Sequence, residues 1–299
     1  MVAPSSVGPA VLSVRRLRSR DRTAALEHLG GDAAANLMLL DAASRLGGIA
    51  ALSGLRGRVP GRSTSCTLAG AFEGDALRGV LSVRPSILLD VGATPEAVEA
   101  LAPQLEPVGA GLIRSPACGV DLLWKHLERC GRRAAVDRRE LGHRLELGAA
   151  RMAALPASPG LRPARPGDLE DLVVAARASL REEGRPDPFH GDPEGFRSWV
   201  SGRVARAHVL EDEAGRVVFV AYADVQRTEG WLLQGVYTWP DRRRRGFART
   251  GVAGLARRAA AAGARHVQLA VVHGNGPAES LYGSLGFQPF LELRTILFQ

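Results

Sequence analysis

Cysteine is scarce in this chain of 299 residues. The three copies, Cys66, Cys118 and Cys130, are odd in number, widely separated and without a Cys-x-x-Cys pair. This pattern argues against a disulfide framework and against a zinc site, so we expect no metal cofactor. Small buried or half-buried thiols are the favoured interpretation.

Long apolar runs are missing as well. No stretch approaches the roughly 18 apolar residues that a membrane span needs. The arginines Arg15, Arg16, Arg18 and Arg20 follow the mildly apolar residues 2–14, which is opposite to the order in a secretory signal. We therefore expect a cytoplasmic protein.

Lysine is nearly absent, since Lys125 is the only one among 39 basic residues and the formal net charge is +8. Such a one-sided choice resembles a genome-wide preference for arginine. The charge would permit contact with nucleic acid. We do not expect that partner, because a single arginine cluster, Arg242 to Arg245, lies in a turn suited to phosphate.

The length is that of about two domains, and prolines and glycines interrupt any periodicity near residue 157. We expect a flexible arm over residues 1–12, a first domain over 13–147, a linker over 148–160 and a second domain over 161–299. In the first domain, Thr94-Pro95-Glu96 begins a helix over 95–105, and an apolar stripe before Gly131 predicts another. Residues 137–140 are interpreted as a solvated helix face.

The second domain is expected to alternate helices and strands. Helices are predicted from residue 168 to about 180 and over 193–207, and a hairpin is predicted between strands 207–212 and 217–225. A strand over 231–238 leads into a helix that ends near 262, followed by a strand over 266–272. A further helix after Asn275 and two closing strands, 288–290 and 293–298, complete the domain.

The turn after the strand 231–238 reads Arg243-x-x-Gly246-x-Ala248. Glycine and a small residue at a helix start let a ligand approach the backbone, and the free N–H groups there form an anion site. The arginines of the turn, with Arg249 one turn later, add charge suited to a pyrophosphate. A phosphorylated cofactor is therefore expected.

This turn resembles the acyl-CoA-binding signature of the GNAT superfamily of N-acetyltransferases. A later segment, Asn275-x-x-Ala278-x-x-Leu281-Tyr282-x-x-Leu285-Gly286-Phe287, is similar to a second motif of that family, and the two occur in the family's order. A second copy of the first pattern, Arg45-x-x-Gly48-x-Ala50, follows a helical run and is discarded. The chain resembles tandem GNAT proteins, in which a degenerate first domain precedes an intact acetyltransferase domain. The resemblance implies an α/β (α+β) chain of two GNAT-like domains, each a mixed, largely antiparallel sheet flanked by helices.

The resemblance also implies an activity, the transfer of an acetyl group from acetyl-CoA to a primary amine by direct attack. Tyr282 matches the tyrosine that protonates the departing sulfur, although it also fits an apolar helix stripe. Asn275 is a cofactor contact, a helix cap or both. The cofactor residues implied are Val236, Tyr237, Thr238, Arg243, Arg244, Arg245, Gly246, Phe247, Ala248, Arg249, Asn275 and Tyr282.

The general base is less well defined. Glu182 and Glu183 lie in the loop expected to cover the acceptor, and we name them as candidates. Asp224 and a water-relayed base remain open, whereas His273 is interpreted as a surface residue.

The acceptor is a small-molecule or peptide amine that the sequence does not identify. The chain is expected to be a monomer or homodimer. The competing hypothesis is a non-catalytic protein that binds acyl-CoA and has a regulatory role.

Overall fold

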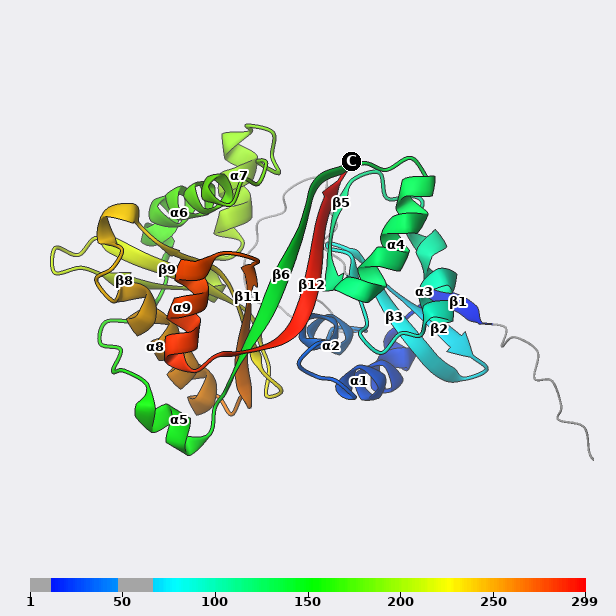
Figure 1. Ribbon diagram of the computed structural model, residues 1–299, viewed down its shortest axis with the longest axis horizontal. Helices are drawn as coiled ribbons and strands as arrows, with labels where there is room; N and C mark the ends of the chain where they lie inside the picture. The colour runs from blue at the N-terminus through cyan, green and yellow to red at the C-terminus, as the bar shows by residue number, and fades with distance from the viewer. Residues whose placement is uncertain (1–11, 48–66) are drawn as a thin grey trace, which may run out of the picture. The chain divides into compact units, whose positions relative to one another are not determined.

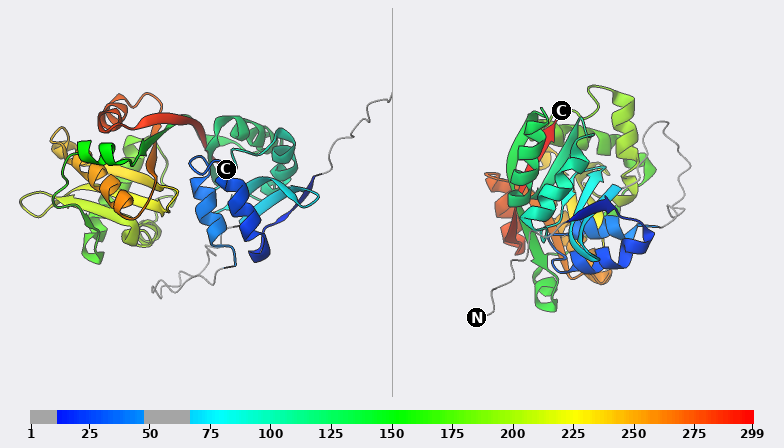
Figure 2. Two further views of the ribbon diagram at one scale, coloured as in Figure 1. Left: turned by 90° about the horizontal axis from the view of Figure 1, so that it is seen from below. Right: turned by 90° about the vertical axis from the view of Figure 1, so that its right-hand side faces the viewer.

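A computed structural model describes residues 12–47 and 67–299 of the chain (Figures 1 and 2). The chain divides into two compact units, Met1–Glu140 with Glu292–Gln299, and Leu141–Leu291. Cys66, residues 1–11 of the predicted arm and residues 48–50 of the discarded motif lie outside the described residues. Among the helices of the described ranges, none combines the length and the hydropathy that crossing a bilayer requires.

Both halves of the sequence share one order of elements: a strand, two helices, three strands, a helix, a strand, a helix and a strand. In the first half these are β1 (Ser13–Arg16), α1 (Arg22–Gly30), α2 (Leu37–Ser44), β2 (Thr67–Glu73), β3 (Ala76–Arg84), β4 (Leu88–Leu89), α3 (Pro95–Leu101), β5 (Gly111–Pro116), α4 (Ala117–Arg129) and β6 (Ala134–Glu146). In the second they are β7 (Arg162–Pro163), α6 (Leu169–Glu182), α7 (Pro193–Ser201), β8 (Ala207–Glu211), β9 (Val217–Gln226), β10 (Trp231–Thr238), α8 (Phe247–Ala261), β11 (His266–Val272), α9 (Gly276–Leu285) and β12 (Gln288–Phe298). This repeat confirms the predicted fold class.

The strands are largely antiparallel, as expected. In the first unit β1, β2, β3 and β4 pair in that order, and β5 pairs with the end of β12 from Gly111↔Phe298 to Pro116↔Leu293. In the second unit β7, β8, β9 and β10 form antiparallel pairs, whereas β10 and β11 run parallel.

The end of the chain groups with the first unit, which differs from the predicted domain limits. Residues 292–299 were expected in the second domain, yet this part of β12 pairs with β5. The two predicted closing strands are a single strand, β12, and the predicted linker contains the short helix α5 (Ala149–Ala154). The limits of the two units therefore depend on strand pairing between distant segments, which cannot be read from amino-acid composition.

The prediction of a helix face at residues 137–140 is wrong, because these residues lie in β6. Asp137 and Arg139 are exposed while Glu140 is buried, which is the alternation of a strand. Arg114 and Arg138 approach the Glu140 carboxylate at 3.0 and 2.9 Å. Ion pairing lets a charged residue take the inner position.

Two apolar clusters cover the opposite faces of β9. Phe219 and Ala221 pack with α8, whereas the alternate residues Val220 and Tyr222 pack with α6 and α7. Figure 1 shows α8 on one side of the yellow strands and the α6–α7 pair on the other. The side chains of β9 and β10 are thus divided between a face under α8 and a face under α6 and α7.

The contact between α8 and β9 leaves no room for a methyl group at Gly251. A Cβ there would lie 2.3 Å from Cε1 of Phe219, whose side chain is fully buried. We expect Gly251→Ala to lower the free energy of unfolding by about 1–3 kcal/mol, because the ring must move within a packed core. Urea denaturation followed by circular dichroism measures this change.

Gly283 of α9 is the matched control, since a Cβ there meets nothing within 4 Å. Gly283→Ala is expected to raise stability by about 0.5–1 kcal/mol through helix propensity alone. Equal effects of the two substitutions would contradict a packing role for Gly251.

Candidate functional site

Strand β10 separates from β11 partway along its length. The parallel pairing comprises Trp231↔Val267 and Leu232↔Gln268, and no later pair of these two strands occurs within the described residues. The pairing of β10 with β9 continues to Thr238↔Phe219. The second half of β10 therefore lacks a partner on its β11 side, where an extended ligand could supply one.

A bulge lies in the unpartnered half of β10. The register with β9 shifts between Gln234 and Tyr237, and Gly235 has a φ of +55°. A Cβ at Gly235 would lie 2.9 Å from Cδ2 of Tyr222, so glycine fits both the backbone angle and the space. A bulge disrupts the ladder locally. Val236, one of the implied cofactor residues, lies in the bulge, whereas Thr238, another of them, stays paired with Phe219.

The turn after β10 has the backbone geometry of an anion site. Arg244 and Gly246 adopt left-handed angles, with φ of +64° and +85°. Gly246 occupies the N-cap of α8, and no side chain caps the first amides of the helix. Alternation into left-handed angles turns successive N–H groups toward one concavity, and the helix dipole adds to the attraction for an anion.

The arginines of this turn differ in their surroundings. The Arg243 guanidinium donates from Nη2 to both carboxylate oxygens of Glu182, at 2.8 and 2.7 Å, and from Nε to the carbonyl of Thr238 at 3.0 Å. Arg249 donates to Ser284 Oγ at 3.1 Å. Within residues 12–47 and 67–299, Arg244 and Arg245 form no ion pair and are exposed.

The two candidate bases already have partners. Glu182, the last residue of α6, also accepts a hydrogen bond from the Tyr237 hydroxyl at 3.0 Å. Burial and this hydrogen bond to Glu182 raise the pKa of Tyr237. Glu183 accepts from Ser179 Oγ at 3.2 Å. Their assignment as catalytic residues therefore stays a prediction, and Glu182 has a further role in linking α6 to the arginine turn.

Asp224, the other acid considered, is also paired. Its carboxylate contacts Arg203 at 2.6 Å and Arg206 at 3.4 Å. His273 is exposed, as expected of a surface residue.

Tyr282 is buried on α9, with 6% of its surface exposed. Its ring packs 5.6 Å from that of Phe287, and it shares an apolar cluster with Val236 of the bulge and Phe247 of the helix start. Burial raises the pKa of Tyr282. Tyr282, which is predicted to protonate the departing sulfur, therefore lies in one apolar cluster with β10 and with the start of α8.

Asn275 caps α9, where its side-chain oxygen accepts a hydrogen bond from the Ala278 amide at 3.3 Å. The capping interpretation is therefore confirmed. A cofactor contact by Asn275 stays a prediction.

Tyr222 is a site residue that the sequence analysis missed. It lies directly beneath Gly235, its hydroxyl is buried without a hydrogen-bond partner, and Arg203 stacks 4.0 Å from its ring centroid. Burial raises the pKa of this phenol as well. Its place opposite the bulge depends on the register between β9 and β10, and no sequence motif predicts that register.

The FR47-like protein family model matches residues 216–295, which span β9, β10 and the arginine turn. No curated protein matches the chain.

Solved structures share the fold over nearly the whole chain. A Drosophila protein has a TM-score of 0.71 at 16% identity, covering 95% of this chain and 98% of its own. A GCN5-related N-acetyltransferase from Sphaerobacter thermophilus has a TM-score of 0.55 at 16% identity, covering 97% and 95%. A GNAT-family acetyltransferase from Colwellia psychrerythraea has a TM-score of 0.53 at 14% identity, covering 96% and 100%.

These identities show the fold, and the family model matches the part of the chain that holds the separated strand and the arginine turn. The chain is therefore similar to the FR47-like family over residues 216–295, and it shares its fold with solved acetyltransferases of the GNAT family along nearly its whole length.

Proposed function

We propose that the protein is an N-acetyltransferase that moves an acetyl group from acetyl-CoA to a primary amine. The observation that carries this proposal is the arrangement along one strand. β10 loses its β11 partner after Leu232, bulges at Gly235 and ends in a turn with two left-handed residues before an uncapped helix. An extended arm with a diphosphate at one end and a thioester at the other fits such a strand.

The proposed roles follow from these positions. Amides of the turn from Arg243 to Ala248 bind the pyrophosphate, with Arg244, Arg245 and Arg249 adding charge. The free edge of β10 pairs with the pantetheine arm, and the amide of Val236 points to the thioester oxygen. The amine nitrogen forms a bond to the acyl carbon, the carbon–sulfur bond breaks, and Tyr282 donates its proton to the sulfur.

A base must accept the proton that the amine loses. Glu182 and Glu183 are retained as candidates, with a relayed water as the third. Both side chains occupy the α6 end of the site, where Glu182 already contacts Tyr237 of β10. The acceptor is proposed as a small molecule or a peptide amine, and the protein as a monomer or homodimer.

The alternative is a non-catalytic protein that binds acyl-CoA. Two observations favour it: Tyr282 lies within the apolar core, and Glu182 is bound by Arg243. Under this alternative the arginine turn still binds the diphosphate, but no acetyl group is transferred.

The test is to incubate the protein with acetyl-CoA and a library of primary amines. Released thiol and the acetylated product, identified by mass spectrometry, are both measured. Product formation that depends on enzyme concentration supports the proposal. Binding of CoA without product from any amine class, including peptides and amino sugars, would favour the alternative.

Glu182→Gln separates two roles of this side chain. The substitution removes the charge that neutralises Arg243, so that guanidinium becomes available to a phosphate. Because the pair is 43% exposed on each side, we expect a modest effect, a fall of about 2–5-fold in the dissociation constant for CoA. Calorimetric titration with CoA measures it.

Glu183→Gln is the matched control, since Glu183 makes no contact with Arg243 among the interactions of the described residues. An unchanged CoA affinity for Glu182→Gln would contradict the proposed competition. A base at either position would appear separately, as a loss of turnover of about 100-fold or more.

A further inference from the structure

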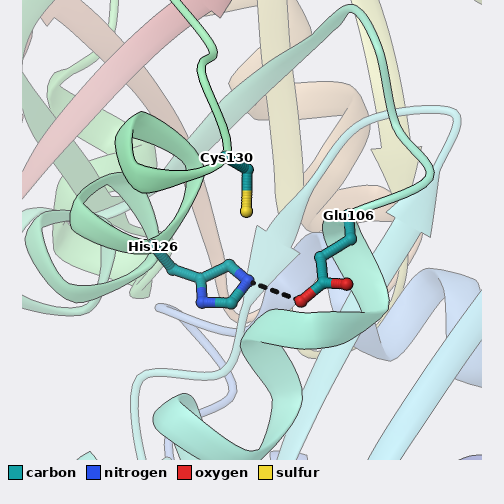
Figure 3. A group of neighbouring side chains, drawn as sticks. All are labelled: Glu106, His126 and Cys130. Atoms are coloured by element: carbon teal, nitrogen blue, oxygen red, sulfur yellow. Dashed lines mark ion pairs between the residues drawn. The ribbon is translucent and has the colours of Figure 1, made fainter.

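Three side chains of the first unit converge at one end of α4. Atoms of Glu106, His126 and Cys130 that could each bind a metal lie within 4.8 Å of one another. Nε2 of His126 is 3.3 Å from a carboxylate oxygen of Glu106. Figure 3 shows the three groups approaching a common space, with the imidazole and the thiol both carried by α4 and its cap.

The backbone fixes this arrangement. His126 and Cys130 are four residues apart, so they share one face of the helix, and the Cys130 amide donates to the His126 carbonyl at 3.1 Å. Arg132 holds the third group in place: its guanidinium donates to the carbonyls of Glu106 and Val108 at 2.9 and 3.0 Å. The segment carrying Glu106 is thereby tied to the end of α4.

The ion pair between His126 and Glu106 leaves the imidazole nitrogen without a hydrogen bond. Nε2 of His126 is buried and lacks a hydrogen-bond partner in the described structure, despite its distance of 3.3 Å from the carboxylate oxygen. The nitrogen thus faces the Glu106 carboxylate at ion-pair distance without forming a hydrogen bond, and the Cys130 thiol lies near both groups. A buried polar atom in that state needs a ligand or a water to satisfy it.

We propose that Glu106, His126 and Cys130 bind a zinc ion, with the fourth position open to water or another ligand. A carboxylate, a neutral imidazole and a thiolate together carry two negative charges, which balance a divalent cation. Zinc accepts this mixture of oxygen, nitrogen and sulfur, and three protein ligands with one open position are a known arrangement. In a tetrahedral site the ligand atoms lie roughly 3.3–3.6 Å apart, so groups that lie within 4.8 Å of one another must close by at most about 1.5 Å.

The site is accessible to an ion from solvent. The Glu106 side chain is 54% exposed and that of His126 is 18% exposed. The site belongs to the first unit, so the zinc proposal does not depend on the acetyltransferase proposal. The sequence argued against zinc because no cysteine pair is present, whereas these ligands come from a helical i, i+4 pair and a residue twenty positions earlier.

The experiment uses the full chain with Cys66→Ser and Cys118→Ser, so that Cys130 is the only thiol. Cys118 lies exposed at the start of the same helix, outside the cluster, and its replacement is the control for thiol content. After dialysis against a chelator, the protein is titrated with Co²⁺, and the charge-transfer absorption between thiolate and cobalt is recorded. Zn²⁺ is then added in competition.

We expect one equivalent of Co²⁺ to produce the thiolate band and one equivalent of Zn²⁺ to remove it. Cys130→Ser should abolish the band, and Glu106→Gln or His126→Gln should raise the Zn²⁺ dissociation constant at least about 10-fold. Circular dichroism checks that each variant folds. A chain that shows no thiolate band, or whose Zn²⁺ affinity is unchanged in Glu106→Gln and His126→Gln, overturns the proposal.

A second measurement needs no substitution in the cluster. In the unmodified chain, Zn²⁺ should slow alkylation of Cys130 by iodoacetamide at least about 10-fold while leaving Cys118 unaffected, as read by peptide mass spectrometry. Equal rates at Cys130 with and without Zn²⁺ overturn the proposal.

Discussion

Gly246→Val should raise the dissociation constant for CoA by at least about 100-fold. Gly246 has a φ of +85° at the N-cap of α8, an angle that a β-branched residue adopts only under strain. Valine relieves that strain by leaving the left-handed region, and the N–H groups of the turn then no longer point to one concavity. The interaction lost is the one on which the pyrophosphate site depends.

The variant should still fold. A Cβ at Gly246 meets nothing within 4 Å, so the cost in stability comes from the backbone change alone and is about 1–2 kcal/mol. Gly263, at the other end of α8, is the matched control, because it has a φ of +79° and equally open surroundings. Gly263→Val should destabilise the protein by a similar amount and leave CoA binding unchanged.

Arg244→Gly separates the backbone from the charge. Glycine keeps the left-handed angle that Arg244 adopts, with φ of +64°, and removes one guanidinium. We expect a smaller loss of CoA affinity, about 10-fold, that diminishes at high salt. Isothermal titration at two ionic strengths measures it.

If Gly246→Val binds CoA as tightly as Gly263→Val, the turn is not the pyrophosphate site.

The turn could be predicted from the sequence because its information is local. A strand with β-branched and aromatic residues, a glycine and an apolar helical stripe follow one another along the chain, and each is recognisable from its own residues. The same holds for Thr94, whose hydroxyl accepts from the Ala97 amide at 3.2 Å and begins α3 at Pro95 as expected. Caps and turns of this kind are set by neighbouring residues.

Features that depend on partners distant in sequence could not be predicted. The charged run at residues 137–140 gave no sign of a strand, because its inner carboxylate is neutralised by Arg114 and its outer Asp137 by Arg294 at 2.6 Å. The pairing of β12 with β5 is equally invisible in composition. At the site, the bond between Arg243 and Glu182 joins residues 61 positions apart.

Tyr282→Phe should lower turnover by about 10²–10⁴-fold while leaving CoA affinity within about 2-fold. The ring stays, so its packing against Phe287 is preserved, and only the hydroxyl that donates the proton is lost. Burial raises the pKa of Tyr282, which keeps the phenol protonated over the whole neutral range. Turnover of the unmodified protein should therefore show no loss from tyrosine ionisation below about pH 10.

Tyr222→Phe is the comparison for this test, because Tyr222 is a second buried phenol close to the bulge and its hydroxyl lacks a hydrogen-bond partner. Tyr222 lies on the face under α6 and α7, whereas Tyr282 belongs to the cluster under α8 that contains Val236. If Tyr282 is the proton donor, the turnover of Tyr222→Phe stays within about 10-fold of that of the unmodified protein. Any loss of turnover in Tyr222→Phe then depends on the concentration of the amine acceptor. If turnover instead falls only in Tyr222→Phe, the proton comes from the acceptor face and Tyr282 is a core residue. Steady-state rates with varied acetyl-CoA and varied amine distinguish the two, since they separate a loss in the chemical step from a loss in acceptor binding.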